Sequence, residues 1–284
     1  MIPGAFTYHR PDSVDAAVGL LAEWGDDARV IAGGHSLIPV MKQRITDISH
    51  LVDLAGVESM KGISVDGGTV TIGAMTTQHE LISSDALAAA APIVREASLQ
   101  IADPQVRYIG TIGGNVANGD PANDMPGLMQ TLDATYHLAG PNGTRTVAAR
   151  DFYEAAYFTA HEDDEILTGI TFAATSGGYA YEKQKRKIGD YATAAAGVLL
   201  TVEGGSCTSA SVALTNLSDT PVFCEEAVGV LVGSSLDDAA VGAAVKAAVD
   251  ASDPVADTRG PVDFKKYVAG VIVKKAIESA RSRA

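Results

Sequence analysis

The spacing of apolar residues divides the first sixty positions into a small α/β unit. Ser13 can cap a helix over residues 14–24, whose apolar residues fall on one stripe, and Gly25 follows as a stop signal. Short apolar strands are expected at residues 29–32 and 50–54. The segment between them is long enough for a crossover, so the pattern predicts a small mixed α/β lobe.

The middle of the chain reads as antiparallel strands beside a broken helical region. Two turn signals, Asp66-Gly67-Gly68 and Pro141-Asn142-Gly143, predict hairpins. The strands they join, and one further strand, are expected at residues 63–65, 69–72, 134–138, 145–148 and 166–172. The stretch 77–100 has a helical pattern, interrupted at Ser83-Ser84 and at Pro92.

A second domain is predicted after Ser176-Gly177-Gly178. Three strands are expected there, followed by three helices, which indicates a separate α+β unit. The strands are expected at residues 179–185, 194–202 and 209–216, and the helices at 225–231, 236–249 and 264–282.

Composition and charge exclude several classes of function. A chain of 284 residues, 46% hydrophobic, can bury a sizeable core. Its net charge of −14 argues against unaided binding of nucleic acid or anionic membranes, apart from a short basic run at residues 183–187. The two cysteines are too few for an iron–sulfur cluster and are expected to be reduced and structural. Without a targeting segment or a long apolar run, the chain is expected to be soluble and cytoplasmic.

Two glycine-rich segments carry the candidate chemistry. The first, Ala32-Gly33-Gly34-His35-Ser36-Leu37, follows a strand, and its backbone N–H groups could converge on phosphate oxygens. It matches neither a Rossmann fingerprint nor a P-loop, and a plain turn is the alternative. The second, residues 110–115, continues into the polar stretch 118–124. Bare N–H groups with amide and carboxylate side chains would suit a pyrophosphate carrying a hydroxylated chain, and a solvent loop is the alternative. Together the segments suggest one extended ligand held between two subdomains.

At these residues the sequence resembles a known family. The first segment together with Thr111-Ile112-Gly113-Gly114-Asn115 is similar to the paired FAD signature of molybdenum-hydroxylase flavoproteins, within the wider vanillyl-alcohol-oxidase-like flavin family. Within this family the chain most resembles the medium subunits of aerobic carbon monoxide dehydrogenases. Further segments that carry the resemblance are residues 3–6, 9–11, 101–105, 118–121 and 185–192.

The resemblance implies a fold and a place in a complex. The expected fold class is α+β: an FAD-binding domain of the vanillyl-alcohol-oxidase-like (PCMH) type over residues 1–177, with subdomains of about 1–56 and 57–177. A C-terminal domain with a three-stranded antiparallel sheet and helices would cover 178–284. Noncovalent FAD would receive electrons from two [2Fe–2S] clusters on a small subunit and pass them to a quinone-type acceptor. A large subunit with molybdopterin cytosine dinucleotide, Mo and Cu would oxidise CO. A dimer of such heterotrimers is expected, in the cytoplasm or held at the inner face of the cell membrane through the complex.

The resemblance also assigns residues. Residues 32–36 and 111–115 would hold the pyrophosphate, and Asp124 would accept from cofactor hydroxyls. Ile101 and Leu167 would pack at the flavin or adenine end, with Lys185 and Tyr191 near the isoalloxazine, where a cation favours the reduced flavin. His35 stands where the family often has Gln. No catalytic residue and no metal ligand is expected in this chain. The full candidate set is Arg29, Val30, Ile31, Ala32, Gly33, Gly34, His35, Ser36, Leu37, Ala74, Ile101, Ala102, Val106, Gly110, Thr111, Gly114, Asn115, Ala117, Asn118, Asn123, Asp124, Leu167, Lys185 and Tyr191.

Three alternatives remain open on the sequence. The chain could serve a hydroxylase for an aldehyde, nicotinate or xanthine. It could be a free-standing flavin oxidoreductase with a general acid or base among His79, His137 and His161, which otherwise read as surface or core histidines. It could also be an assembly module that binds FAD only for structure.

Overall fold

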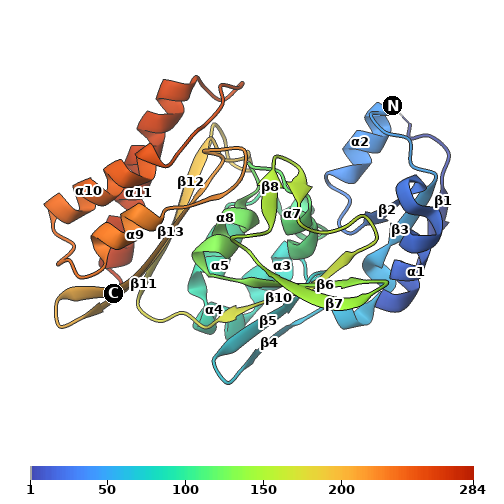
Figure 1. Ribbon diagram of the computed structural model, residues 1–284, viewed down its shortest axis with the longest axis horizontal. Helices are drawn as coiled ribbons and strands as arrows, with labels where there is room; N and C mark the ends of the chain where they lie inside the picture. Colours follow the sequence, from blue (N-terminus) through green and yellow to red (C-terminus); the bar gives the residue numbers. More distant parts are fainter. Residues whose placement is uncertain (1) are drawn as a thin grey trace.

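Three larger sheets follow one another along the chain in the computed structural model, which describes residues 2–284 (Figure 1). The N-terminal part, drawn in blue, lies at one end of the molecule, and the C-terminal part, in orange and red, lies at the other. A five-stranded sheet with its helices occupies the middle. The mixed α+β class expected from the sequence is confirmed.

The N-terminal lobe is a parallel sheet with the strand order β1-β3-β2. Its strands are β1 (Thr7–His9), β2 (Ala28–Ile31) and β3 (His50–Asp53). Helix α1 (Val14–Trp24) joins β1 to β2, and the Ser13 side chain accepts the N–H of Ala16 at its start. Helix α2 (Leu37–Gln43) joins β2 to β3. The predicted strand–crossover–strand unit is therefore confirmed.

The central sheet is antiparallel in the order β4-β5-β10-β6-β7. Both predicted hairpins are confirmed: Gly67 and Gly68 have φ of +53° and +82° in one turn, and Gly143 has φ of +109° in the other. The broken helical stretch forms three helices, with Ser84 capping the second and Pro92 beginning the third. The elements are β4 (Ile63–Asp66), β5 (Thr69–Gly73), α3 (Gln78–Ser83), α4 (Asp85–Ala90), α5 (Pro92–Ser98), β6 (Thr135–Gly140), β7 (Gly143–Ala148), the ribbon β8 (Tyr153–Ala155) with β9 (Phe158–Thr159), and β10 (Ile166–Ala173).

Three helices lie where the sequence predicted none: α6 (Pro104–Arg107), α7 (Ile112–Ala117) and α8 (Asp124–Thr131). The second glycine segment is thus the start of α7, and the polar stretch leads into α8. Glycines lower helix propensity, which hides α7. Every residue of α8 is buried, so it has no polar face and no amphipathic period to detect. Single-turn 3₁₀ helices lie at Gly25–Asp27, Leu54–Gly56 and Glu58–Met60.

The C-terminal sheet is antiparallel in the order β11-β12-β13-β14. The three predicted strands are β11 (Gly178–Gln184), β12 (Ala194–Glu203) and β13 (Ser206–Thr215), and a two-residue strand, β14 (Val222–Phe223), adds to the edge. The helices are α9 (Glu225–Leu231), α10 (Asp238–Asp250) and α11 (Val262–Arg281). Within residues 2–284, no helix combines the length and the apolarity needed to cross a bilayer.

The two faces of the C-terminal sheet are buried in different cores. Ala194 and Ala196 of β12 pack with α9–α11, whereas Ala195 between them belongs to the central core. Helix α8 covers this second face. An added Cβ at Gly127 of α8 would lie 2.2 Å from Oγ1 of Thr215, so the glycine allows the helix to approach the sheet.

We predict that Gly127→Ala lowers the free energy of unfolding by about 1–3 kcal/mol, the usual cost of overpacking a tight contact. Gly242→Ala is the matched control, because Gly242 also lies inside a helix but an added Cβ there meets nothing within 4 Å. That control should be neutral or stabilising by up to ~1 kcal/mol. Urea unfolding of both variants measures the difference. Equal stability of the two would show that α8 does not press on the sheet through Gly127.

Candidate functional site

The first glycine segment, residues 32–37, joins β2 to α2 and needs both of its glycines. Gly34 has a φ of +73°, and an added Cβ would lie 2.7 Å from Cδ1 of Ile38. At Gly33 an added Cβ would lie 2.7 Å from Cα of Gly110. The two glycine segments therefore touch backbone to backbone.

Backbone donors of the first glycine segment are free. Within residues 2–284, five consecutive N–H groups have no hydrogen-bond acceptor, those of Gly33, Gly34, His35, Ser36 and Leu37. The glycines are half-buried and His35 is exposed. A run of unpartnered N–H groups at a tight turn forms a concavity that suits phosphate oxygens, and the Ser36 hydroxyl can add a donor.

In the second glycine segment, residues 110–115, backbone N–H groups are instead hydrogen-bonded to other parts of the protein. The N–H of Ile112 donates to the carbonyl of Thr76 at 2.9 Å, and that of Gly113 donates to the carbonyl of Ala74 at 2.8 Å. Thr111 caps α7, its hydroxyl accepting the N–H of Gly114 at 3.1 Å. The expectation of bare N–H groups here is wrong, because these donors anchor α7 to the end of β5.

The polar stretch 118–124 also turns inward more than expected. Oδ1 of Asp120 accepts the N–H of Ala122 at 2.9 Å, which tightens the turn before α8. Nδ2 of Asn123 donates to the carbonyl of Asn115 at 2.9 Å, and Oδ1 of Asn115 accepts from Met125. These side chains link α7 to α8.

Asp124 lies in a buried cluster with strand β11. Its Oδ2 is 2.7 Å from Nζ of Lys183 and its Oδ1 accepts from the hydroxyl of Tyr181 at 2.7 Å. The side chains of Lys183 and Asp124 are 1% and 5% exposed. Burial raises the pKa of Asp124, and the charge and hydrogen bond of Lys183 partly offset this. Each carboxylate oxygen has one partner within the protein and a further lone pair, so acceptance by Asp124 from cofactor hydroxyls stays a prediction.

Lys185 lies beside Gln100, the residue that precedes Ile101 in the chain. Nε2 of Gln100 donates to the carbonyl of Tyr181 at 3.0 Å, and Nζ of Lys185 lies 3.5 Å from Oε1 of Gln100. Burial lowers the pKa of Lys185, the Lys183 cation lowers it further, and Asp124 opposes both. Ala102 has a φ of +43°, the left-handed region.

The loop after Lys185 leads to Tyr191, which is half-exposed. Its ring centroid lies 5.7 Å from the guanidinium carbon of Arg259, and Arg259 also approaches Asp190 at 3.8 Å. Gly189, with φ of +80°, lies over Ala102: an added Cβ would be 3.1 Å from the Ala102 carbonyl oxygen. Lys185 and Tyr191 thus flank a loop that rests on the 101–102 turn.

The other candidates occupy the elements around the two glycine segments. Arg29, Val30 and Ile31 form β2, Ala32 begins the first glycine segment, Ala74 follows β5, Val106 lies in α6 and its carbonyl accepts the N–H of Gly110, Ala117 and Asn118 end α7, and Leu167 lies buried in β10. Contact of any of them with a cofactor stays a prediction.

Tyr181, Lys183 and Gln100 were not among the predicted site residues. The period-2 pattern of β11 places Tyr181 and Lys183 on one face, and this signal was present in the sequence. Gln78, whose N–H donates to the carbonyl of Gly110, was not predicted either. Both polar atoms of the Gln78 side chain are buried without a partner within residues 2–284. A buried amide carries no sequence signal of its own.

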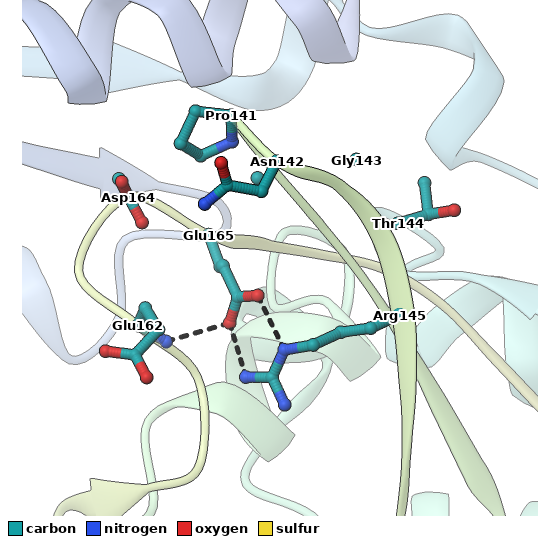
Figure 2. A pocket seen from close by; sticks show the side chains of 9 residues that line it. Pro141, Asn142, Gly143, Thr144, Arg145, Glu162, Asp164 and Glu165 are labelled. Atoms are coloured by element: carbon teal, nitrogen blue, oxygen red, sulfur yellow. Dashed lines mark hydrogen bonds and ion pairs between the residues drawn. The ribbon is translucent and has the colours of Figure 1, made fainter.

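A cavity of about 100 Å³ lies elsewhere, between the β6–β7 turn and residues 162–165. Figure 2 shows Arg145 and Glu165 facing each other there, with Nε and Nη2 donating to the two carboxylate oxygens at 2.6 Å each. The Arg145 hydrogen bonds lower the pKa of Glu165. Because these charges neutralise each other and no glycine-segment residue lines the cavity, it is not part of the candidate site.

Comparison with known proteins shows the family of this chain. The family model for the FAD binding domain in molybdopterin dehydrogenase matches residues 4–175, and that for the CO dehydrogenase flavoprotein C-terminal domain matches residues 179–280. The carbon monoxide dehydrogenase medium chain of Afipia carboxidovorans is 58% identical over 100% of this chain and 99% of its own, and that of Hydrogenophaga pseudoflava is 44% identical over 100% and 99%. A chain in the structure of reconstituted CO dehydrogenase from Oligotropha carboxidovorans superposes with a TM-score of 0.98 at 58% identity, covering 100% of both chains.

We predict that Gly34→Ala abolishes retention of FAD by the purified protein. The added methyl would press on Ile38 and strain the turn whose N–H groups are free. Gly25→Ala is the matched control, because Gly25 also has a positive φ, +47°, but an added Cβ there meets nothing within 4 Å. It should lose about 1–3 kcal/mol from backbone strain, because its φ of +47° and ψ of −127° are sparsely populated by residues other than glycine, yet keep its flavin. Flavin content per chain, beside circular dichroism, measures both, and normal flavin in the Gly34 variant would place the phosphate site elsewhere.

Proposed function

We propose that this chain, which belongs to the family of flavoproteins with the FAD-binding domain of molybdopterin dehydrogenases, is the electron-transferring flavin subunit of an aerobic carbon monoxide dehydrogenase. The observation that carries the proposal is full-length identity of 58% to a carbon monoxide dehydrogenase medium chain, with a second such chain at 44%. Both relatives carry the same name, which favours CO over an aldehyde, nicotinate or xanthine as the substrate of the complex.

The first glycine segment is our candidate for the FAD pyrophosphate. Its five free N–H groups suit phosphate oxygens, whereas the donors of Ile112 and Gly113 in the second glycine segment are used within the protein. The second segment contributes by holding its backbone against Gly33 and by the Thr111 hydroxyl. Bound FAD supplies the ability to take electrons one or two at a time. Lys185 and Tyr191 remain our candidates for its flavin end.

Residues for the other redox steps must come from partners. A [2Fe–2S] cluster takes four cysteine ligands in these systems, and this chain has two, both buried. We therefore propose a small subunit with two [2Fe–2S] clusters as the electron donor and a large subunit with the molybdopterin cytosine dinucleotide, Mo and Cu as the site of CO oxidation. A quinone-type acceptor, a dimer of heterotrimers and an assembly at the inner face of the cell membrane complete the proposal.

Exposed apolar side chains near the candidate site support a partner-covered surface. Leu99, Tyr108, Ile109 and Ile188 are 54%, 57%, 56% and 93% exposed, and they flank the 101–102 turn and the second glycine segment. Large apolar side chains gathered on a surface commonly mark protein contacts.

We also propose that the domain boundary lies between residues 177 and 178, before β11.

We predict that the purified chain carries FAD noncovalently. The free N–H groups and the absence of an attachment chemistry at His35 motivate this. Acid or heat should release a yellow chromophore with the mass of FAD. Flavin that remains on the denatured polypeptide would contradict the noncovalent assignment.

We predict that the isolated chain does not oxidise CO, and that its flavin is reduced by CO only in the presence of the large and small subunits. Purification from the native source, native mass spectrometry and CO-dependent bleaching of the flavin test this. A stable monomer that oxidises CO unaided would overturn the proposed function. FAD that dithionite reduces but the partner subunits do not reduce would favour a structural role.

A further inference from the structure

Lys183, near the end of β11, and Lys185, just beyond it, lie near a single buried carboxylate, that of Asp124. Lys183 and Lys185 are two residues apart on the run that ends β11, about 7 Å along an extended strand. Nζ of Lys183 lies 2.7 Å from Oδ2 of Asp124. Within residues 2–284, Nζ of Lys185 has one polar partner, the neutral Oε1 of Gln100 at 3.5 Å. The cluster therefore holds two cations against one anion, and the uncompensated charge lies at Lys185.

The contacts of Lys183 leave it no freedom to exchange roles with Lys185. Its Nζ also donates to the Gln100 carbonyl at 3.4 Å, and its side chain is 1% exposed. Tyr181 occupies the other oxygen of Asp124, and its buried hydroxyl has a strongly raised pKa and stays neutral. Asp124 is near enough to Lys185 for each to shift the pKa of the other. An unpaired Asp124 would thus attract Lys185.

We propose that Lys183 is a positioning residue for the flavin site. Because Lys183 forms the ion pair with Asp124, the positive charge of Lys185 has no paired anion and is free to face the flavin. The inference rests on the proposed function, because it requires FAD near Lys185. Lys183 itself need not touch the cofactor. Loss of Lys183 would let Asp124 capture Lys185, so the flavin would lose its cation although Lys185 is still present.

The test compares flavin midpoint potentials in the purified complex. Lys185→Met should lower the equilibrium for flavin reduction at least tenfold, about 30 mV for a two-electron couple. Lys183→Met should lower it by a similar factor. Adding Asp124→Asn to Lys183→Met removes the carboxylate that would capture Lys185, and should restore the potential to within about twofold of the wild-type equilibrium. Lys187→Met removes an exposed cation from the neighbouring loop and is the matched control, with a change below twofold.

The rescue separates a charge effect from damage to the fold, because a merely structural role predicts that the second substitution adds to the harm. A normal potential in Lys183→Met, with full flavin content and a native circular dichroism spectrum, would overturn the inference. So would failure of the double variant to recover. If Lys183→Met does not fold, the double variant is measured alone. Its flavin midpoint potential should match that of the wild type, and a mismatch would overturn the inference. If the complex binds flavin but Lys185→Met leaves the midpoint potential unchanged, the inference is wrong and the proposed function is unaffected. A wild-type chain without FAD would instead sink the proposed function.

Discussion

The buried pair of Lys183 and Asp124 is the constraint on which the arrangement of the molecule depends. It joins the first residue of α8 to β11, where the central part meets the C-terminal sheet. A buried ion pair gains little over an apolar pair, but removing one partner costs about 3–5 kcal/mol because the other charge remains buried. Such a pair therefore fixes register more than it adds stability. The observed docking of α8 satisfies the carboxylate, and Gly127 allows the helix to approach the sheet closely.

The candidate flavin end is built outward from that joint. Nε2 of Gln100 donates to the Tyr181 carbonyl of β11, and Oε1 of Gln100 faces Lys185. The following turn, at Ala102, supports the loop that carries Gly189 and ends at Tyr191. Residues from both domains are thus set relative to each other by hydrogen bonds that begin at Asp124. A change in the docking of α8 would move Lys185 and Tyr191 together, although within residues 2–284 neither is hydrogen-bonded to α8.

How far the sequence predicted this structure depended on exposure. Helices with one buried face, such as α1, show their period and were found almost to the residue. Helix α8 is buried on all sides and α7 contains two glycines, so neither helix was predicted. The pairing of Asp124 with Lys183 at the start of α8 was not predicted either, because it depends on where that buried helix docks. The residues that come together in the site were found through family resemblance, whereas Gln100 and Lys183 depend on a domain contact that local pattern does not encode.

The two glycine segments look equivalent in the sequence, but they use glycine for different physical ends. In the first, Gly34 has a positive φ that turns consecutive N–H groups outward, and none of them finds a protein acceptor within residues 2–284. In the second, Gly113 lacks a side chain so that α7 can approach Ala74, where an added Cβ would lie 2.5 Å from the Ala74 Cβ. The N–H of Gly113 donates to the Ala74 carbonyl at this contact. Since a phosphate needs donors that the fold has left unused, the first segment is the better candidate for hydrogen bonds to the ligand, and the second supports the first through the backbone contact between Gly33 and Gly110.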